Sequence, residues 1–290
     1  MKVGILAPLR APEATPEFVA ELAQGAEEVG ATSIWPGEHV VLFPQAATDK
    51  PARVGTPDGT FSLPRGSGLV DLTVVLSYLA ALTRTVRLGT GVRILPQANP
   101  VYVAKEVASL DWLSNGRVDF GIGVGSNPAE FAACGAPYER RGPRADEYVQ
   151  VIRALWRDDP ARFTGRFWTL PACTLDPKPR QPGGPPVFVG GHSDAALARV
   201  ARLGDGWYGI GRSPESTRER LAVLDELLRE AGRSRGEVRV VMGAVGDPDR
   251  PSSLIPYEDA GVDEVLVPLG RQDRDGLARA LDAVHSLAGT

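Results

Sequence analysis

An adjacent carboxylate and imidazole, Glu38 and His39, are the first side chains in this sequence that could move a proton. Both residue types act as general acids and bases near neutral pH. They directly follow a short apolar segment over 33–36 that ends as a strand would, and a long polar segment over 44–68 comes soon after them. We therefore predict that Glu38 and His39 are catalytic, although a solvated surface pair would show the same two residues.

Alternating glycines, Gly121, Gly123 and Gly125, precede Ser126. They remove side chains from one face of a strand, so that bare backbone could approach a flat ring or a phosphate closely. The dinucleotide-binding fingerprint would need glycine where Ser126 stands and would open the first strand–helix unit, so that interpretation is disfavoured. Contact with a ligand and close packing of the strand both remain open.

A second glycine motif, Gly190-Gly191-His192-Ser193, directly precedes a helical pattern. The free N–H groups and the dipole at the start of a helix attract anions, and a phosphate is the natural ligand. An ordinary glycine turn with Ser193 as the helix cap explains the same residues equally well.

Other kinds of chemistry find little support. The three histidines are widely separated and give no metal-ligand spacing, and His285 belongs to the solvated face of the last helix, so we predict no metal site. The two cysteines, Cys134 and Cys173, form neither a disulfide framework nor a C-x-x-C motif, which indicates a reducing cytoplasm. The G-x-S-x-G motif of many hydrolases is missing from the sequence.

Eight short apolar segments, most of them followed by a helical pattern, must position these residues. The predicted strands span 3–7, 33–36, 86–94, 118–124, 186–189, 206–209, 238–244 and 264–268. Eight strand–helix units predict a (β/α)8 barrel, an α/β TIM-barrel fold, whose active site lies at the C-terminal ends of the strands. A doubly wound sheet would also alternate strands and helices, but would more naturally stop near five or six strands.

The predicted helical patterns cover 18–29, 69–83, 99–113, 144–156, 194–202, 214–231, 256–260 and 274–287. We expect one domain over 1–290 with loop insertions at 40–69 and 158–185. The segment 44–68 is predicted to be a long loop and 163–170 a small turn-centred excursion. Glycine and proline supply 58 of the 290 residues, and we expect them to mark chain turns and close approaches of backbone to a ligand.

The charge and composition of the chain argue against several classes of binding partner. The formal charge of −4 argues against nucleic acid, because a chain that neutralises phosphates is normally basic. No stretch approaches the roughly 18 apolar residues of a membrane span, so we expect no membrane association. Lysine is scarce, with four residues, which argues against a lysine clamp on a phosphorylated substrate.

Four stretches together resemble the bacterial luciferase-like flavin and deazaflavin oxidoreductases, over essentially the whole chain. They are 33–39, 88–100, 110–125 and 204–207. Within that superfamily the chain looks most similar to the branch that uses coenzyme F420, a carrier of hydride. The resemblance implies a luciferase-like TIM barrel that holds the deazaflavin ring at its mouth. The chain is shorter than many relatives between residues 170 and 186, where prolines indicate a stiff crossing.

The resemblance also implies roles for individual residues. Strand three would contain a non-prolyl cis peptide at Gly91-Val92 that backs the ring. Glu38 would contact the ring, and His39 would lie beside its reacting face. Asn127 and Glu130 match a variable loop on the substrate side. The implied cofactor-binding residues are Glu38, Gly91, Val92, Val124, Gly125, Ser126, Gly190, Gly191, His192 and Ser193.

The leading hypothesis is therefore an F420-dependent oxidoreductase that transfers a hydride between C5 of the deazaflavin and a small organic substrate. An FMN-dependent luciferase-like monooxygenase, supplied by a partner flavin reductase, is the alternative within the same superfamily. A non-catalytic barrel that binds a cofactor is a second alternative, which replacement of Glu38 and His39 would have supported. Relatives are often dimers, so a homodimer is expected.

Overall fold

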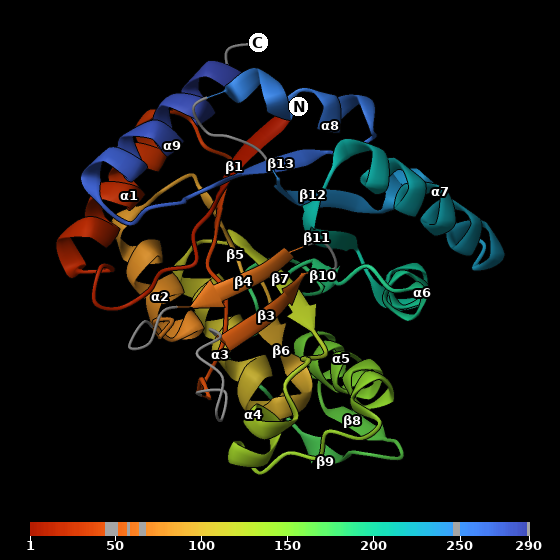
Figure 1. Ribbon diagram of the computed structural model, residues 1–290. Coiled ribbons are helices and arrows are strands. Elements are labelled where there is room, and N and C mark those ends of the chain that lie inside the picture. The colour runs from red at the N-terminus through yellow and green to blue at the C-terminus, as the bar shows by residue number, and fades with distance from the viewer. Residues whose placement is uncertain (44–51, 57–58, 64–67, 246–249, 289–290) are drawn as a thin grey trace.

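Eight parallel strands form a closed barrel surrounded by helices (Figure 1). The structure, a computed structural model, describes residues 1–43, 52–56, 59–63, 68–245 and 250–288, and of 52–56 and 59–63 only the backbone. The ring closes through pairing of β7 with β10 and of β13 with β1, which confirms the predicted (β/α)8 barrel. The barrel strands are β1 (Lys2–Leu6), β2 (Ser33–Trp35), β5 (Arg87–Gly89), β7 (Val118–Gly123), β10 (Val187–Gly190), β11 (Gly206–Arg212), β12 (Arg239–Ala244) and β13 (Glu264–Pro268).

The helices begin at capping side chains that the sequence supplies. Thr15, Asp71 and Ser193 each accept a hydrogen bond from a backbone N–H three residues later, which satisfies a donor that the helix itself leaves free. The helices are α1 (Pro16–Glu28), α2 (Leu72–Leu82), α3 (Pro100–Leu113), α4 (Pro128–Ala133), α5 (Arg141–Arg157), α6 (Asp194–Leu203), α7 (Pro214–Glu230), α8 (Pro256–Asp259) and α9 (Arg274–Ala288), with 3-10 turns η1 (Leu95–Gln97), η2 (Arg235–Glu237) and η3 (Pro251–Leu254). No helix in the described parts of the chain is long and apolar enough to cross a membrane.

Strand three is interrupted, which corrects the prediction of one strand over 86–94. It consists of β5 and the two-residue strand β6 (Arg93–Ile94), both paired with β7. Between them the Gly91-Val92 peptide is cis, as the family resemblance implied. Gly91 donates its N–H to the carbonyl of Pro36 at 2.8 Å, so this part of the chain joins the end of strand two.

Two small hairpins lie outside the barrel. β3 (Ala52–Thr56) pairs with β4 (Gly59–Leu63), so the prediction of an unstructured loop over 44–68 is wrong for these ten residues. Strands this short contain too few periods for an alternating pattern to stand out. The parts of that prediction at 44–51, 57–58 and 64–67 lie outside the described residues. β8 (Ala161–Thr164) and β9 (Thr169–Cys173) form the second hairpin, which confirms the excursion expected near 163–170.

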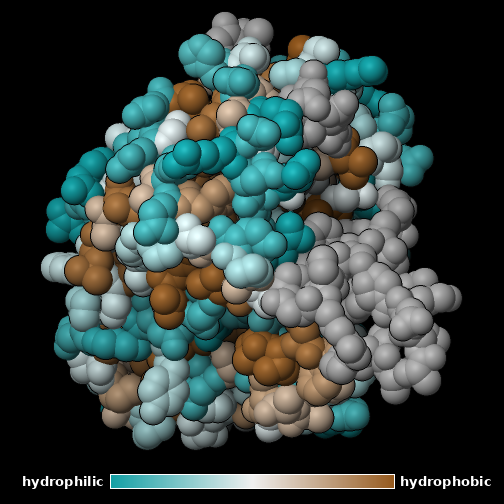
Figure 2. Space-filling model, turned by 60° about the vertical axis from the view of Figure 1, so that its left-hand side comes forward, coloured by the Kyte–Doolittle hydropathy of each residue, from teal (hydrophilic) through white to brown (hydrophobic). Residues whose placement is uncertain are grey.

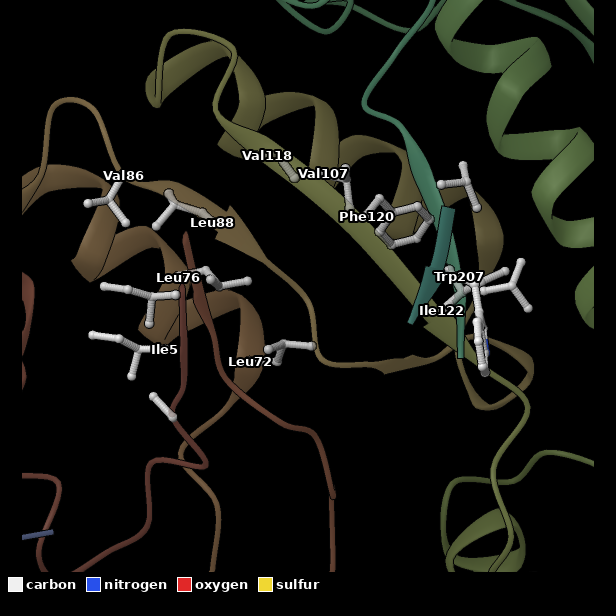
Figure 3. Close-up of a cluster of buried hydrophobic side chains, with 14 of the residues drawn as sticks. Ile5, Leu72, Leu76, Val86, Leu88, Val107, Val118, Phe120, Ile122 and Trp207 are labelled. Atoms are coloured by element: carbon white, nitrogen blue, oxygen red, sulfur yellow. The ribbon is translucent and has the colours of Figure 1, made fainter. Parts of the chain in front are cut away.

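The hydrophobic core has two layers. The larger one lies between the strands and the surrounding helices, and Figure 3 shows part of it, with Phe120 and Ile122 from β7 and Leu72 and Leu76 from α2. The smaller layer fills the barrel interior. Its fully buried members are Trp35, Phe188, Tyr208, Val241 and Leu266.

A buried ionic network closes the opposite end of the barrel from the strand ends where the sequence placed the site. Asp119 is completely buried near the start of β7 and pairs with Arg87 at 2.6 Å and with Arg239. Glu264, at the start of β13, accepts from Ser33, which in turn accepts from the indole N–H of Trp35. Polar groups at the N-terminal ends of barrel strands serve stability rather than catalysis.

Candidate functional site

Glu38 follows β2 at the C-terminal mouth of the barrel, and both of its carboxylate oxygens are engaged. Arg93 donates to Oε1 at 2.9 Å and the backbone N–H of Ile94 donates to Oε2 at 2.5 Å. Burial raises the pKa of Glu38 above the ordinary value of a glutamic acid and outweighs the opposing effects of Arg93 and the Ile94 N–H. The side chain therefore anchors β6, directly after the cis peptide, and has no oxygen without a protein donor.

Arg93 is a site residue that the sequence analysis missed. Besides Glu38, its guanidinium contacts Thr73 on α2 at 3.4 Å and Glu106 on α3 at 3.3 Å. It thus joins the mouth of the barrel to two outer helices. Arg93 is one of two arginines in the predicted strand 86–94, and a charged residue in a barrel strand was the sequence feature that could have pointed to it.

His39 is paired with Glu130, although the two residues are far apart in the sequence. The Nδ1 atom of His39 lies 3.0 Å from Oε2 of Glu130, and the N–H of Val40 donates to Oε1 at 2.7 Å. The Glu130 side chain is only 1% exposed and that of His39 is 15% exposed. The structure thus brings one predicted catalytic residue together with one predicted substrate-side residue.

The ionisation of Glu130 determines how the imidazole is oriented. Burial acts to raise the pKa of Glu130, but the hydrogen bond and charge of His39 and the Val40 N–H outweigh it, so that this pKa lies below its ordinary value. An ionised carboxylate only accepts hydrogen bonds, which assigns the shared proton to Nδ1 of His39. The other ring nitrogen, Nε2, makes no hydrogen bond within the described residues.

Gln97, in η1, lies beside the same carboxylate and was also missed. Its amide helps to lower the pKa of Glu130. Neither its Nε2 nor its Oε1, both buried, makes a well-formed hydrogen bond within the described part of the chain. The amide therefore acts on Glu130 through a contact whose hydrogen-bond geometry is poor.

Three of the glycines that the sequence analysis singled out face the protein's own atoms. A Cβ on Gly121 would meet the Thr90 carbonyl and the Trp35 ring, and a Cβ on Gly123 or Gly190 would meet Val92 at 3.0 Å or less. These glycines therefore let strand three and the barrel interior pack closely. Contact of Val92 and these glycines with a cofactor remains a prediction.

Gly91 lies against the side chain of Tyr208 in the barrel interior. A Cβ at this position would lie 2.7 Å from the hydroxyl of Tyr208. That hydroxyl is buried and has no partner among the described residues, and burial raises the pKa of Tyr208, so it stays protonated. A hydrogen-bond donor without an acceptor thus lies directly behind the cis peptide.

The segment after β7 is already held by hydrogen bonds of its own. Half-buried Val124 follows the strand, and Gly125 takes a φ of +72° that side chains disfavour. The carbonyl of Ser126 accepts from Tyr138 at 3.3 Å, and the Asn127 side chain caps α4 by accepting from Ala129. The side chain of Asn127, predicted on the substrate side, therefore has a structural contact.

The second glycine motif lies at the start of α6, as predicted. Gly191 has a φ of +113°, which requires glycine, and its carbonyl accepts from the indole of Trp207 at 2.7 Å. His192 contacts the Ile210 carbonyl through Nε2 at 2.9 Å, and the Ser193 hydroxyl caps the helix. The capped turn is therefore present, and binding of an anion at this turn stays a prediction.

Metal chemistry gains no support from the geometry. Among the described residues no group of three or more histidine, cysteine, aspartate or glutamate side chains could hold an ion. His285 is exposed on α9, as expected, and Cys134 and Cys173 form no disulfide.

Comparisons with known proteins agree with this architecture. The family model described as luciferase-like monooxygenase matches residues 1–245. An uncharacterized protein of Mycobacterium tuberculosis is 34% identical over 251 residues, 86% of this chain and 84% of that protein. An FMNH2-dependent dimethylsulfone monooxygenase of Pseudomonas putida is 30% identical over 176 residues, 59% of this chain and 47% of that enzyme. The coenzyme F420-dependent tetrahydromethanopterin reductase of Methanopyrus kandleri superposes with a TM-score of 0.78 at 18% identity, covering 98% and 97% of the two chains.

Proposed function

The chain belongs to the luciferase-like monooxygenase family, and from this premise we propose that it is an oxidoreductase that uses coenzyme F420. The reaction is the transfer of a hydride between C5 of the deazaflavin ring and a small organic substrate. The observation that carries the proposal is the His39–Glu130 pair, which joins the segment after β2 to the start of α4. It provides an oriented imidazole where a substrate could exchange a proton.

The mouth offers features that fit a ring with a phosphate-bearing arm. Gly191, directly after β10, has a positive φ and lets backbone approach a ligand closely, whereas at Gly125 the side chains of Ile94 and Phe131 already occupy the space beside Cα. Tyr208 keeps an unused donor behind the Gly91-Val92 peptide. The first turn of α6 supplies amide donors and a positive dipole end for a phosphate.

The bound deazaflavin would supply or accept two electrons as a hydride. His39 would hold the accompanying proton at Nε2, giving it to the substrate heteroatom during reduction and taking it during oxidation. Glu130 would keep the ring in one tautomer and one orientation, as a carboxylate does for other catalytic histidines. Glu38 would hold β6, and so the cis peptide, in place through Arg93 and Ile94.

The choice of F420 rests on the residue-level resemblance of the sequence to the F420-dependent branch. Length and topology do not decide it, because the F420-dependent reductase and a long-chain alkane monooxygenase both correspond to this chain almost from end to end. The second candidate remains an FMN-dependent monooxygenase with a flavin reductase as partner, because the FMNH2-dependent relative is more similar in sequence.

Equilibrium titration of the purified chain with F420 and with FMN tests the proposal. We expect micromolar or tighter binding of F420 and at least tenfold weaker binding of FMN. On a substrate found by screening alcohols, imines and activated alkenes, His39→Ala should lose turnover while His285→Ala, an exposed histidine on α9, should not. A chain that binds F420 but turns over no member of such a screen would support the non-catalytic alternative.

We also propose a homodimer formed through α2 and α3. The eleven residues of α2 include no charged side chain, yet Val74 is 63% exposed and Tyr78 is 42% exposed. On α3, Tyr102 and Leu113 are 70% and 78% exposed. Figure 2 shows hydrophobic side chains among polar ones on this side of the molecule. A symmetric contact places a surface against its own copy, so a surface without net charge suits it.

Light scattering tests the dimer directly. We expect the mass of two chains for the wild type and of one chain for Tyr78→Glu combined with Leu113→Glu. A cytoplasmic location, proposed from the free thiols of Cys134 and Cys173, would be checked with a fluorescent fusion.

A further inference from the structure

Arg93 lies between two carboxylates that belong to different parts of the fold. Its Nη1 donates to Oε1 of Glu38 at 2.9 Å, and its Nη2 donates to Oε2 of Glu106 at 3.3 Å. Glu38 follows β2 at the barrel mouth, whereas Glu106 lies in the second turn of α3, outside the barrel. The side chain of Arg93 is 15% exposed and that of Glu106 is 37% exposed. One guanidinium group therefore connects the mouth to an outer helix.

The surroundings of Arg93 offer its guanidinium few other acceptors. The residue lines a small indentation between α2 and α3. Four of the apolar residues that line this indentation are labelled in Figure 3: Leu72, Leu76, Val107 and Phe120. Among the described lining residues, only Glu106, Thr73 and Thr90 carry a side-chain oxygen. Thr73 accepts from Nη1 at 3.4 Å, and the Thr90 hydroxyl donates to a backbone carbonyl of β7, so Glu106 is the acceptor that fixes Nη2.

The contact between the arginine and Glu38 continues toward the catalytic pair. Oε2 of Glu38 accepts at 2.5 Å from the N–H of Ile94, the residue directly after the arginine. A Cβ on Gly125 would come within 2.7 Å of the side chains of both Ile94 and Phe131, so these two side chains border the same position. Phe131 follows Glu130 on α4, and Glu130 holds the catalytic imidazole at 3.0 Å. A continuous series of contacts therefore runs from α3 to that imidazole.

We propose that Glu106 is a positioning residue for the barrel mouth, because it holds the guanidinium of Arg93 against Glu38 and so keeps β6 in place. A guanidinium group is a planar fork, and acceptors on two of its amino groups fix its orientation better than one does. Without Glu106, Nη2 would be an unsatisfied donor in a largely buried group, so the guanidinium would turn toward solvent and its contact with Glu38 would lengthen. The inference deepens the proposed function and rests on it only for the effect on cofactor binding.

Amide hydrogen exchange of the purified chain, followed by NMR, tests this contact without a cofactor. The N–H of Ile94 should exchange about tenfold faster in Glu106→Ala than in the wild type, relative to the amide of Val265 in β13 of the same sample. Glu106→Gln still offers an accepting oxygen, so Ile94 should exchange nearly as in the wild type. Glu21→Ala is the matched control and should leave Ile94 unchanged, because Glu21 on α1 is 41% exposed and pairs with an arginine at 3.2 Å.

Arg93→Lys is a second test that leaves Glu106 in place and decides the question if Glu106→Ala does not fold. An ammonium group is a point charge that cannot fork between two carboxylates, so Ile94 should exchange faster in this variant as well. In a titration with F420, Glu106→Ala should bind more weakly than the wild type, and Glu106→Gln should bind nearly as tightly as the wild type.

The two measurements separate the possible failures. If the wild type does not bind F420, the proposed cofactor is wrong, while the exchange of Ile94 still decides the role of Glu106. Unchanged exchange of Ile94 in Glu106→Ala or in Arg93→Lys would overturn the inference, as would an equal acceleration in Glu21→Ala.

Discussion

Glu130→Gln removes the charge that orients His39 while keeping the shape of the side chain. A carboxamide has one accepting oxygen, so it can serve either the Nδ1–H of His39 or the N–H of Val40, but not both as Glu130 does. Losing one hydrogen bond to a charged group costs about 1.5–3 kcal/mol of unfolding free energy. Losing the orientation and charge of the imidazole should lower kcat by roughly 10²–10⁴.

A double-mutant cycle and an NMR measurement check this prediction. The losses in kcat for His39→Ala, for Glu130→Gln and for the double variant should be similar, because residues that act as a unit are not additive. The ¹⁵N spectrum of His39 should show the Nδ1–H tautomer in the wild type and a different tautomer balance in Glu130→Gln. Additive losses, or an unchanged tautomer, would refute the proposed role of Glu130.

For three further substitutions we predict the direction of the change in stability or in a pKa. Asp119→Asn removes a buried carboxylate that pairs with Arg87 and Arg239. It should lower the unfolding free energy by about 3–5 kcal/mol in urea denaturation, with cofactor affinity nearly unchanged. A decrease below about 1 kcal/mol would show that these ion pairs do not stabilise the fold. The pKa of Glu38 is higher in the folded chain than in the unfolded chain. The stability that this side chain contributes is therefore complete below its unfolded-state pKa and falls as pH rises through its folded-state pKa. Glu38→Gln should lower the thermal unfolding temperature less at pH 7 than at pH 4. Gln97→Met removes the buried amide that helps to lower the pKa of Glu130, so this pKa should rise, as its ¹³C carboxyl shift would show; an unchanged pKa would show that Gln97 does not act on Glu130.

The sequence alone predicted most of the fold because each strand–helix unit carries its own local pattern. Short apolar runs and capping residues such as Thr15 and Ser193 set the strands and helix starts without reference to the rest of the chain. The residue pattern did not show the break in strand three, because Val92 and Ile94 are apolar residues typical of a continuing strand. The family resemblance supplied the cis peptide at Gly91-Val92 that local patterns could not.

Pairings within the site were harder to predict than its location. His39 and Glu130 are separated by 91 positions, and the strand order brings them together because β2 and β7 both pair with β5. The partners of Glu38 likewise belong to a different strand, so neighbouring residues in sequence, Glu38 and His39, have separate contacts. Gly121 and Gly123 were identified as special positions, but sequence could not show that Trp35 and Val92 occupy the space beside them.

The central claim is that the barrel mouth, with His39 oriented by Glu130, serves a deazaflavin. Its most direct test is an equilibrium titration of the purified wild-type chain with F420 and with FMN under the same conditions. Binding is monitored by fluorescence. The account predicts saturable F420 binding at micromolar concentration or below, with FMN at least tenfold weaker. Tighter binding of FMN, or binding of neither cofactor, would contradict it.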